Sequence, residues 1–204
     1  NLPVTEYISW KDERSLEQVD GFDTFSLLSD RTGEKFKEIT GMKFRPGLPF
    51  ANVVHLFRTL KKSRTYKIIT IPDWLCTCSG DSTDMGHITM LAGLGFFNVL
   101  TGKVSGELLA VAKELTGANF IFNEPAEVNE ICGYWHNKGK RIPIFAGVGD
   151  LQCAVLGAGN KPESTLSINI GTGSQVSIIK KNAGKSQAEI RPFFNGHVLS
   201  TVTH

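Results

Sequence analysis

Residues 145–152 read FAGVGDLQ, an order that places two glycines and then a carboxylate directly after a short apolar stretch. The stretch 142–147 predicts a strand, and residues 150–158 predict a helix that begins at the carboxylate. Strand, glycine turn and helix in this order are typical of α/β proteins, which bind ligands beside the carboxyl ends of their strands. We therefore expect an α/β fold with a ligand site next to Asp150.

Asp150 itself has two interpretations that the residues leave open. An aspartate at the start of a helix can act as a cap, because its side chain accepts backbone hydrogen bonds there. The same carboxylate can instead act as a general base at the end of the strand. In that case Gly147 and Gly149 would let a ligand approach the backbone closely.

A hairpin is expected downstream, where residues 165–170 and 175–179 predict two strands around the turn 171–174, Gly-Thr-Gly-Ser. The N–H groups and hydroxyls of such a turn can hold phosphate oxygens, although an ordinary glycine hairpin turn has the same sequence. The turn is not a dinucleotide fingerprint, because it lacks the third glycine. The polar linker 159–163 precedes it, so we place a domain boundary there, between residues 1–159 and 160–204.

The N-terminal segment carries a third candidate site, Trp10-Lys11-Asp12-Glu13-Arg14. Alternation over residues 4–10 predicts a strand before it, and apolar spacing predicts helices over 16–28 and 49–60. Trp10 could stack on the apolar face of a sugar while Asp12 and Arg14 bind hydroxyls. The alternative is a surface ion pair beside a core tryptophan.

Composition excludes several classes of protein. The 204 residues include 22 basic and 20 acidic side chains, a net charge of +2 that favours no nucleic-acid partner. A membrane span needs about 20 apolar residues, and the sequence has no such run. The four cysteines lack metal-ligand spacing and read as free thiols of a reducing compartment. We expect a cytoplasmic protein with no metal site of its own, no nucleic acid and no membrane contact.

Taken together, these motifs resemble the FGGY carbohydrate kinases in order and spacing over essentially the whole chain. The segment 96–102, Phe-Phe-Asn-Val-Leu-Thr-Gly, matches the signature segment of that family. Residues 149–152 and 166–172 are most similar to sedoheptulokinase-like members. The resemblance implies an RNase H-like fold of the actin type, with the C-terminal portion of the first kinase domain and the beginning of the second.

The resemblance also implies roles for individual residues. Asp150 matches the catalytic base that takes the proton from the sugar hydroxyl. The sugar side would comprise Trp10, Asp12, Arg14 and Gln152, and the nucleotide side Gly171, Thr172 and Gly173. The implied reaction is the phosphorylation of a sugar hydroxyl, with a ketose and ATP with Mg²⁺ as the ligands.

Two departures from the family pattern limit what is carried over. Glycerol kinases have a glutamine directly after the base, where this chain has Leu151, so that sugar contact is missing or moves to Gln152. The family's first phosphate loop and its adenine-binding half have no counterpart here. We therefore expect an internal piece of a longer kinase, inactive alone, whose Mg²⁺ ligands lie largely elsewhere, and we leave a homo-oligomer open. A non-catalytic sugar-binding or regulatory homologue is the alternative, which the presence of Asp150 disfavours.

Overall fold

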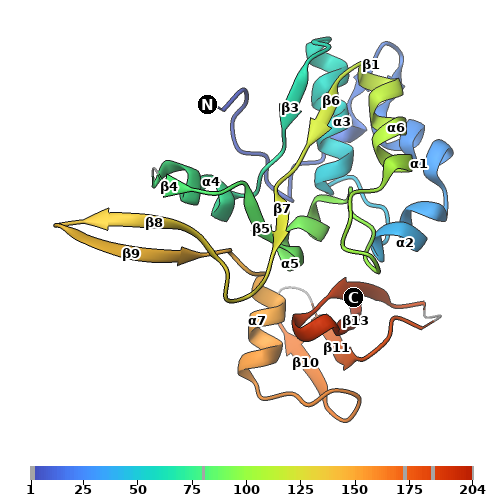
Figure 1. Cartoon of the computed structure of the whole chain (residues 1–204). Coiled ribbons are helices and arrows are strands. Elements are labelled where there is room, and N and C mark those ends of the chain that lie inside the picture. Colours follow the sequence, from blue (N-terminus) through green and yellow to red (C-terminus); the bar gives the residue numbers. More distant parts are fainter. Residues whose placement is uncertain (1–2, 80, 172–173, 185–186, 204) are drawn as a thin grey trace.

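The computed structural model describes residues 3–79, 81–171, 174–184 and 187–203. Its elements form two lobes, with a long hairpin between them that projects from the body (Figure 1). The first lobe is rich in helices: α1 (Thr24–Thr32), α2 (Lys35–Thr40), α3 (Pro49–Leu60), α4 (Ile71–Cys78), α5 (Ile88–Leu91) and α6 (Gly106–Thr116). The second lobe consists of α7 (Asp150–Gly157) and a four-stranded sheet.

The core of the first lobe is built around α3, which was expected over 49–60 and is confirmed. Pro49 stands in its first turn, where the missing N–H of proline costs nothing. Phe50 is fully buried and contacts Phe36 and Phe96, with ring centroids 5.4 and 4.9 Å away. Rings in such contact add specific geometry to the area they bury, so this cluster fixes how α3 packs.

Short parallel pairs lie beside these helices. Strand β3 (Thr65–Lys67) pairs with β6 (Asn119–Ile121), and β5 (Met85–His87) pairs with β7 (Glu124–Ala126). The projecting hairpin is antiparallel and consists of β8 (Ile131–Asn137) and β9 (Lys140–Phe145), with β4 (Asp81–Ser82) paired to β8. Parallel pairing joined by helices confirms the α/β class.

The sheet of the second lobe is antiparallel, in the order β10-β11-β13-β12. The expected hairpin is confirmed as β10 (Leu166–Ile170) against β11 (Ser174–Lys180). β12 (Glu189–Pro192) and β13 (Val198–Thr203) complete the sheet. Val155 of α7 packs in one cluster with Ile179 of β11 and Leu199 of β13, so α7 shares its core with this sheet. The domain boundary between residues 159 and 160 stays a prediction. Val155 precedes that boundary and yet packs in the core of the second lobe.

The expected strand over residues 4–10 and the expected helix over 16–28 are wrong. Residues 4–10 adopt no strand, and the second stretch divides into η1 (Arg14–Leu16), β1 (Gln18–Val19), β2 (Phe22–Asp23) and the start of α1. Asp20 and Gly21 have φ values of 53° and 85°, as a two-residue hairpin turn of type I′ requires. The Asp-Gly pair therefore interrupts the apolar pattern. Asp23 then caps α1 by accepting a hydrogen bond from the backbone N of Ser26 at 2.7 Å.

The two lobes meet where β12 lies against the end of α2. The backbone N of Ile190 donates to the carbonyl oxygen of Gly41 at 2.8 Å. A Cβ on Gly41 would lie 2.1 Å from the carbonyl oxygen of Ile190, and Gly41 has a φ of +75°. Beside this contact the buried carboxylate of Glu189 accepts hydrogen bonds from Arg45 at 2.9 Å and Arg191 at 3.0 Å. We call this contact the lobe joint.

Candidate active site

Asp150 is the first residue of α7 and is exposed. The residue in the N-cap position is Gly149, which has extended backbone angles and no side chain to cap with. Oδ1 of Asp150 accepts a hydrogen bond from the backbone N of Leu151 at 2.7 Å. Asp150 thus does not occupy the N-cap position, and its carboxylate reaches solvent at the positive end of the helix dipole.

The turn before Asp150 packs tightly on its neighbours. A Cβ on Gly147 would lie 2.3 Å from Cβ of Pro72, which stands in the first turn of α4. A Cβ on Gly149 would lie 2.3 Å from Oε1 of Gln152. Gly147 therefore allows close packing on Pro72, whereas a side chain at Gly149 would require the amide end of Gln152 to shift.

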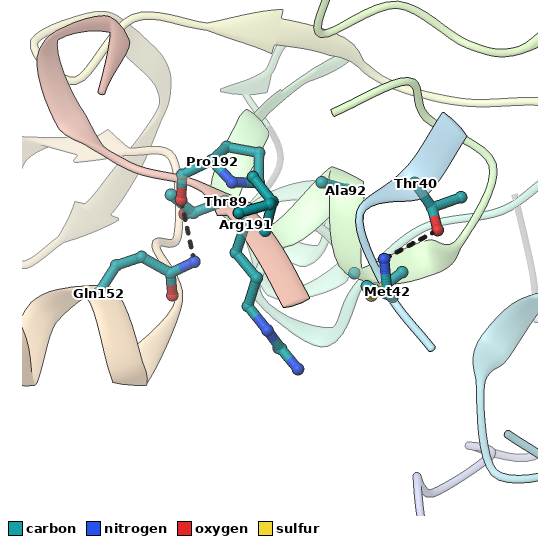
Figure 2. Close-up of a pocket in the computed structure, with 9 residues that line it drawn as sticks. Thr40, Met42, Thr89, Ala92, Gln152, Arg191 and Pro192 are labelled. Carbon is teal, nitrogen blue, oxygen red and sulfur yellow. Dashed lines mark hydrogen bonds between the residues drawn. The ribbon is translucent and has the colours of Figure 1, made fainter. Parts of the chain in front are cut away.

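Gln152 lies in the first turn of α7 and is 4 % exposed. Its Nε2 donates to the carbonyl oxygen of Pro192 in β12 at 3.1 Å, as the dashed line in Figure 2 shows. Thr89 of α5 and Arg191 of β12 line the same small cavity between the lobes. At about 10 Å³ this cavity has room for a single water. Here Gln152 connects α7 to β12, and its expected contact with a sugar stays a prediction.

Residues 10–13 form a loop that leads into η1 at Arg14 and is held against the first lobe. The guanidinium of Arg14 donates to Oδ2 of Asp12 at 2.6 and 2.9 Å, and the backbone N of Arg14 donates to Oδ1 at 2.9 Å. These hydrogen bonds hold the pKa of Asp12 below its usual value, against a smaller opposing effect of burial. Asn52 of α3 donates to the carbonyl oxygen of Asp12 at 2.7 Å and ties the loop to the helix.

Asp12 and Arg14 also line an open hollow of about 420 Å³, together with Glu17, His55 and residues of α3. The volume is in the range of small-molecule sites. Burial lowers the pKa of His55, so its ring is neutral at pH 7. Trp10 is 72 % exposed and is not among the residues of this hollow. Trp10 is thus not part of the core of the described chain, and the ion pair of Asp12 and Arg14 is present.

The expected sites come together only in part. Gly149, Asp150 and Gln152 share one turn of chain, and Asp12 and Arg14 share one ion pair. Among the hydrogen bonds and ion pairs of the described residues, none joins residues 10–14 to Asp150. Gly171 follows β10 and is exposed. Thr172 and Gly173 lie outside the described residues, so the nucleotide turn stays a prediction.

Two features of the described residues concern metal-ligand groups and membrane-spanning helices. Across residues 3–203, apart from the few undescribed positions, no three His, Cys, Asp or Glu side chains gather in a group that could hold a metal ion. Within the same described part, no helix is long and apolar enough to cross a membrane.

Thr89 and Pro72 were not among the expected site residues, yet both contact the turn that carries Asp150. The Oγ1 of Thr89 accepts a hydrogen bond from the backbone N of Gly149 at 3.0 Å. Sixty residues separate the two along the chain. Nothing in the local sequence around a threonine indicates a contact at that distance, so only the folded structure could reveal it.

The exposed carboxylate of Asp150 thus stands at the start of a helix, on a glycine turn that contacts the first lobe. Solved structures narrow the fold further. The chain is similar to a gluconate kinase from Lactobacillus acidophilus, with a TM-score of 0.74 and 18 % identity over 98 % of the chain. A xylulose kinase from the same organism matches with a TM-score of 0.73 and 17 % identity over 98 % of the chain. The glycerol kinase of Plasmodium falciparum, solved with ADP, matches with a TM-score of 0.65 and 14 % identity over 88 % of the chain.

These likenesses show the fold, which is that of sugar kinases of the actin-like ATPase type. The expected fold class is therefore confirmed. The chain spans 41 % of the gluconate and xylulose kinases and 40 % of the glycerol kinase. No family model and no curated protein matches the sequence.

Proposed function

We propose that the chain is the part of an ATP-dependent sugar kinase that carries the catalytic base. One observation carries the proposal: the exposed carboxylate of Asp150 begins α7 on a turn packed against both lobes, in a fold shared with sugar kinases. The proposed substrate is a ketose similar to sedoheptulose, as residues 149–152 and 166–172 indicate by their resemblance.

Asp150 would accept the proton of a sugar hydroxyl while that oxygen bonds to the γ-phosphorus and the bond from phosphorus to ADP breaks. The carboxylate is suited to this role because it is exposed and, among the described ion pairs, takes part in none. When bound, ATP supplies the phosphoryl group and Mg²⁺ offsets the negative charge of the phosphates. Three residues are proposed to contact the nucleotide, and of these the structure describes Gly171. It is exposed and follows β10, so phosphate oxygens can approach its backbone, as the proposed role requires.

Trp10→Ala is expected to raise KM for the sugar in the full-length protein and to leave KM for ATP nearly unchanged. The reason is that removal of an exposed indole takes away only its stacking on the sugar, which is one of the two substrates. Because Trp10 is 72 % exposed, the melting temperature should stay close to wild type. Equal increases of both KM values, measured by steady-state kinetics, would contradict a sugar contact.

Thr172→Val is expected to weaken nucleotide or transition-state binding by roughly 1.5–3 kcal/mol, because one hydrogen bond to a charged phosphate is lost. Valine keeps the shape and the strand propensity of threonine. As the control, the affinity for the sugar in the absence of nucleotide is measured by calorimetry, and it should not change. An unaltered affinity for ATP together with unaltered turnover would leave this segment a plain hairpin turn.

The proposed function is tested with the full-length protein that contains this chain. Ketoses and polyols are incubated singly with ATP and Mg²⁺, and ADP release and phosphorylated product are both measured. Phosphorylation of a ketose supports the proposal. Sugar binding without any turnover would instead support the non-catalytic homologue, and turnover restricted to non-ketose substrates would overturn the proposed substrate class.

A further inference from the structure

A buried chain of hydrogen bonds connects the turn of Asp150 to the first lobe. The backbone N of Gly149 donates to Oγ1 of Thr89 at 3.0 Å. The same Oγ1 lies 2.7 Å from Nδ1 of His87, the last residue of β5 and the N-cap of α5. His87 and Thr89 are 4 % and 7 % exposed, so solvent does not compete for these atoms.

The direction of each hydrogen bond follows from which of the two atoms carries a proton. The amide of Gly149 can only donate, so it takes one lone pair of Oγ1 and leaves the hydroxyl proton of Thr89 free. The backbone N of Thr89 also points at Nδ1 of His87, at 3.3 Å. Two donors therefore converge on Nδ1, which must be the unprotonated nitrogen of a neutral ring that carries its proton on Nε2.

The charge state of His87 agrees with this assignment. Burial lowers the pKa of His87, and the opposing effect of Glu127 is smaller. The ring of His87 also lies near the apolar ring of Phe194, with the two centroids 5.6 Å apart. A neutral imidazole is therefore the form present at pH 7.

The hydrogen bond to Thr89 adds a first-lobe contact to those that the turn makes with the second lobe, where Val148 packs on the cluster of Val155 and the carbonyl oxygen of Gly149 accepts from the backbone N of Cys153 at 3.0 Å. Residues 146–149 adopt no regular structure, and the N-cap position of α7 has no side chain. Pro72 limits the turn sterically at Gly147, but a steric contact only excludes positions. The hydrogen bond from Gly149 to Thr89 sets a position and a direction, one residue before the carboxylate.

We propose that His87 and Thr89 are positioning residues for Asp150: the hydroxyl of Thr89 anchors the amide of Gly149, and Nδ1 of His87 fixes the orientation of that hydroxyl. The proposal rests on the proposed function only in naming Asp150 as the base. Neither residue contacts the reacting atoms. Their effect is to place the carboxylate within reach of the sugar hydroxyl.

The kinetic test compares Thr89→Val with Thr89→Ser in the full-length protein. Valine keeps the size and branching of threonine but removes the acceptor, whereas serine retains it. We expect Thr89→Val to lower kcat about 10- to 100-fold, since small displacements of a catalytic group have effects of this size, with both KM values close to wild type. Thr89→Ser should restore most of kcat. An unaltered kcat in the valine variant, or a serine variant as impaired as the valine variant, would overturn the proposal.

A second measurement needs neither a variant nor activity. In wild-type protein labelled with ¹⁵N-histidine and ¹⁵N-glycine, nuclear magnetic resonance should show His87 with its proton on Nε2 and the Gly149 amide protected from exchange with solvent. A proton on Nδ1, or rapid exchange at Gly149, would overturn the proposal even if Thr89→Val failed to fold. A protein that phosphorylates no sugar but shows both signals would refute the proposed function and leave the anchor established.

Discussion

Asp150→Asn is expected to lower kcat of the full-length protein, if it has the proposed kinase activity, by about 100- to 10,000-fold, the usual contribution of a general base. Asparagine keeps the size of the side chain, and its oxygen can still accept the hydrogen bond from Leu151, but its amide cannot take a proton at pH 7. Affinity for the sugar should fall much less, because the proposed role begins only when the hydroxyl attacks. Steady-state kinetics with direct measurement of sugar binding separates the two effects.

The variant also distinguishes the two roles that the sequence left open for Asp150. If the carboxylate serves only the helix, its loss costs about 0.3–1 kcal/mol of helix-dipole stabilisation and should reduce stability without affecting kcat. Asp23→Asn is a suitable control, because Asp23 has a capping role in α1 and contacts no residue of the candidate site. Turnover near wild type in Asp150→Asn would remove Asp150 from the mechanism.

Gly41→Ala is expected to have the largest effect on stability, because it acts at the lobe joint. Alanine at a φ of +75° costs about 1–2 kcal/mol of backbone strain. Its Cβ would also lie 2.1 Å from the carbonyl oxygen of Ile190, a backbone atom that cannot rotate away. Relief of such overpacking typically costs about 1–3 kcal/mol more. The free energy of unfolding, measured by chemical denaturation, should fall by the sum of both effects.

Gly159→Ala is the matched control for this prediction. Gly41 directly follows α2 and Gly159 stands two residues after the end of α7; the φ of Gly159, +71°, is nearly that of Gly41, but a Cβ there would meet no atom within 4 Å. The control should therefore show the strain alone. Because β12 also holds Gln152 through Pro192, Gly41→Ala should in addition lower kcat, whereas Gly159→Ala should not. Equal destabilisation by the two variants would show that the joint tolerates the added atom.

Several elements were predictable because their signals are local. The start of α7 at Asp150, the hairpin of β10 and β11, and α3 with its proline in the first turn all follow from spacing and turn chemistry within a few residues. Local signals failed in the N-terminal segment. There the apolar spacing over 16–28 resembled a helix, but the Asp20-Gly21 pair favours a type I′ turn and the chain forms a hairpin.

The sequence by itself thus determined the α/β class, the identity of the candidate base and the glycines that surround it, since each depends on neighbouring residues. Only the tertiary structure decided what holds that base in place. The amide of Gly149 finds Thr89, Gly147 packs on Pro72, and Gln152 reaches Pro192, each across 40 or more residues of chain. Contacts of this kind form when separate elements pack on a common core, and neither residue of such a pair carries a sequence signal for the other.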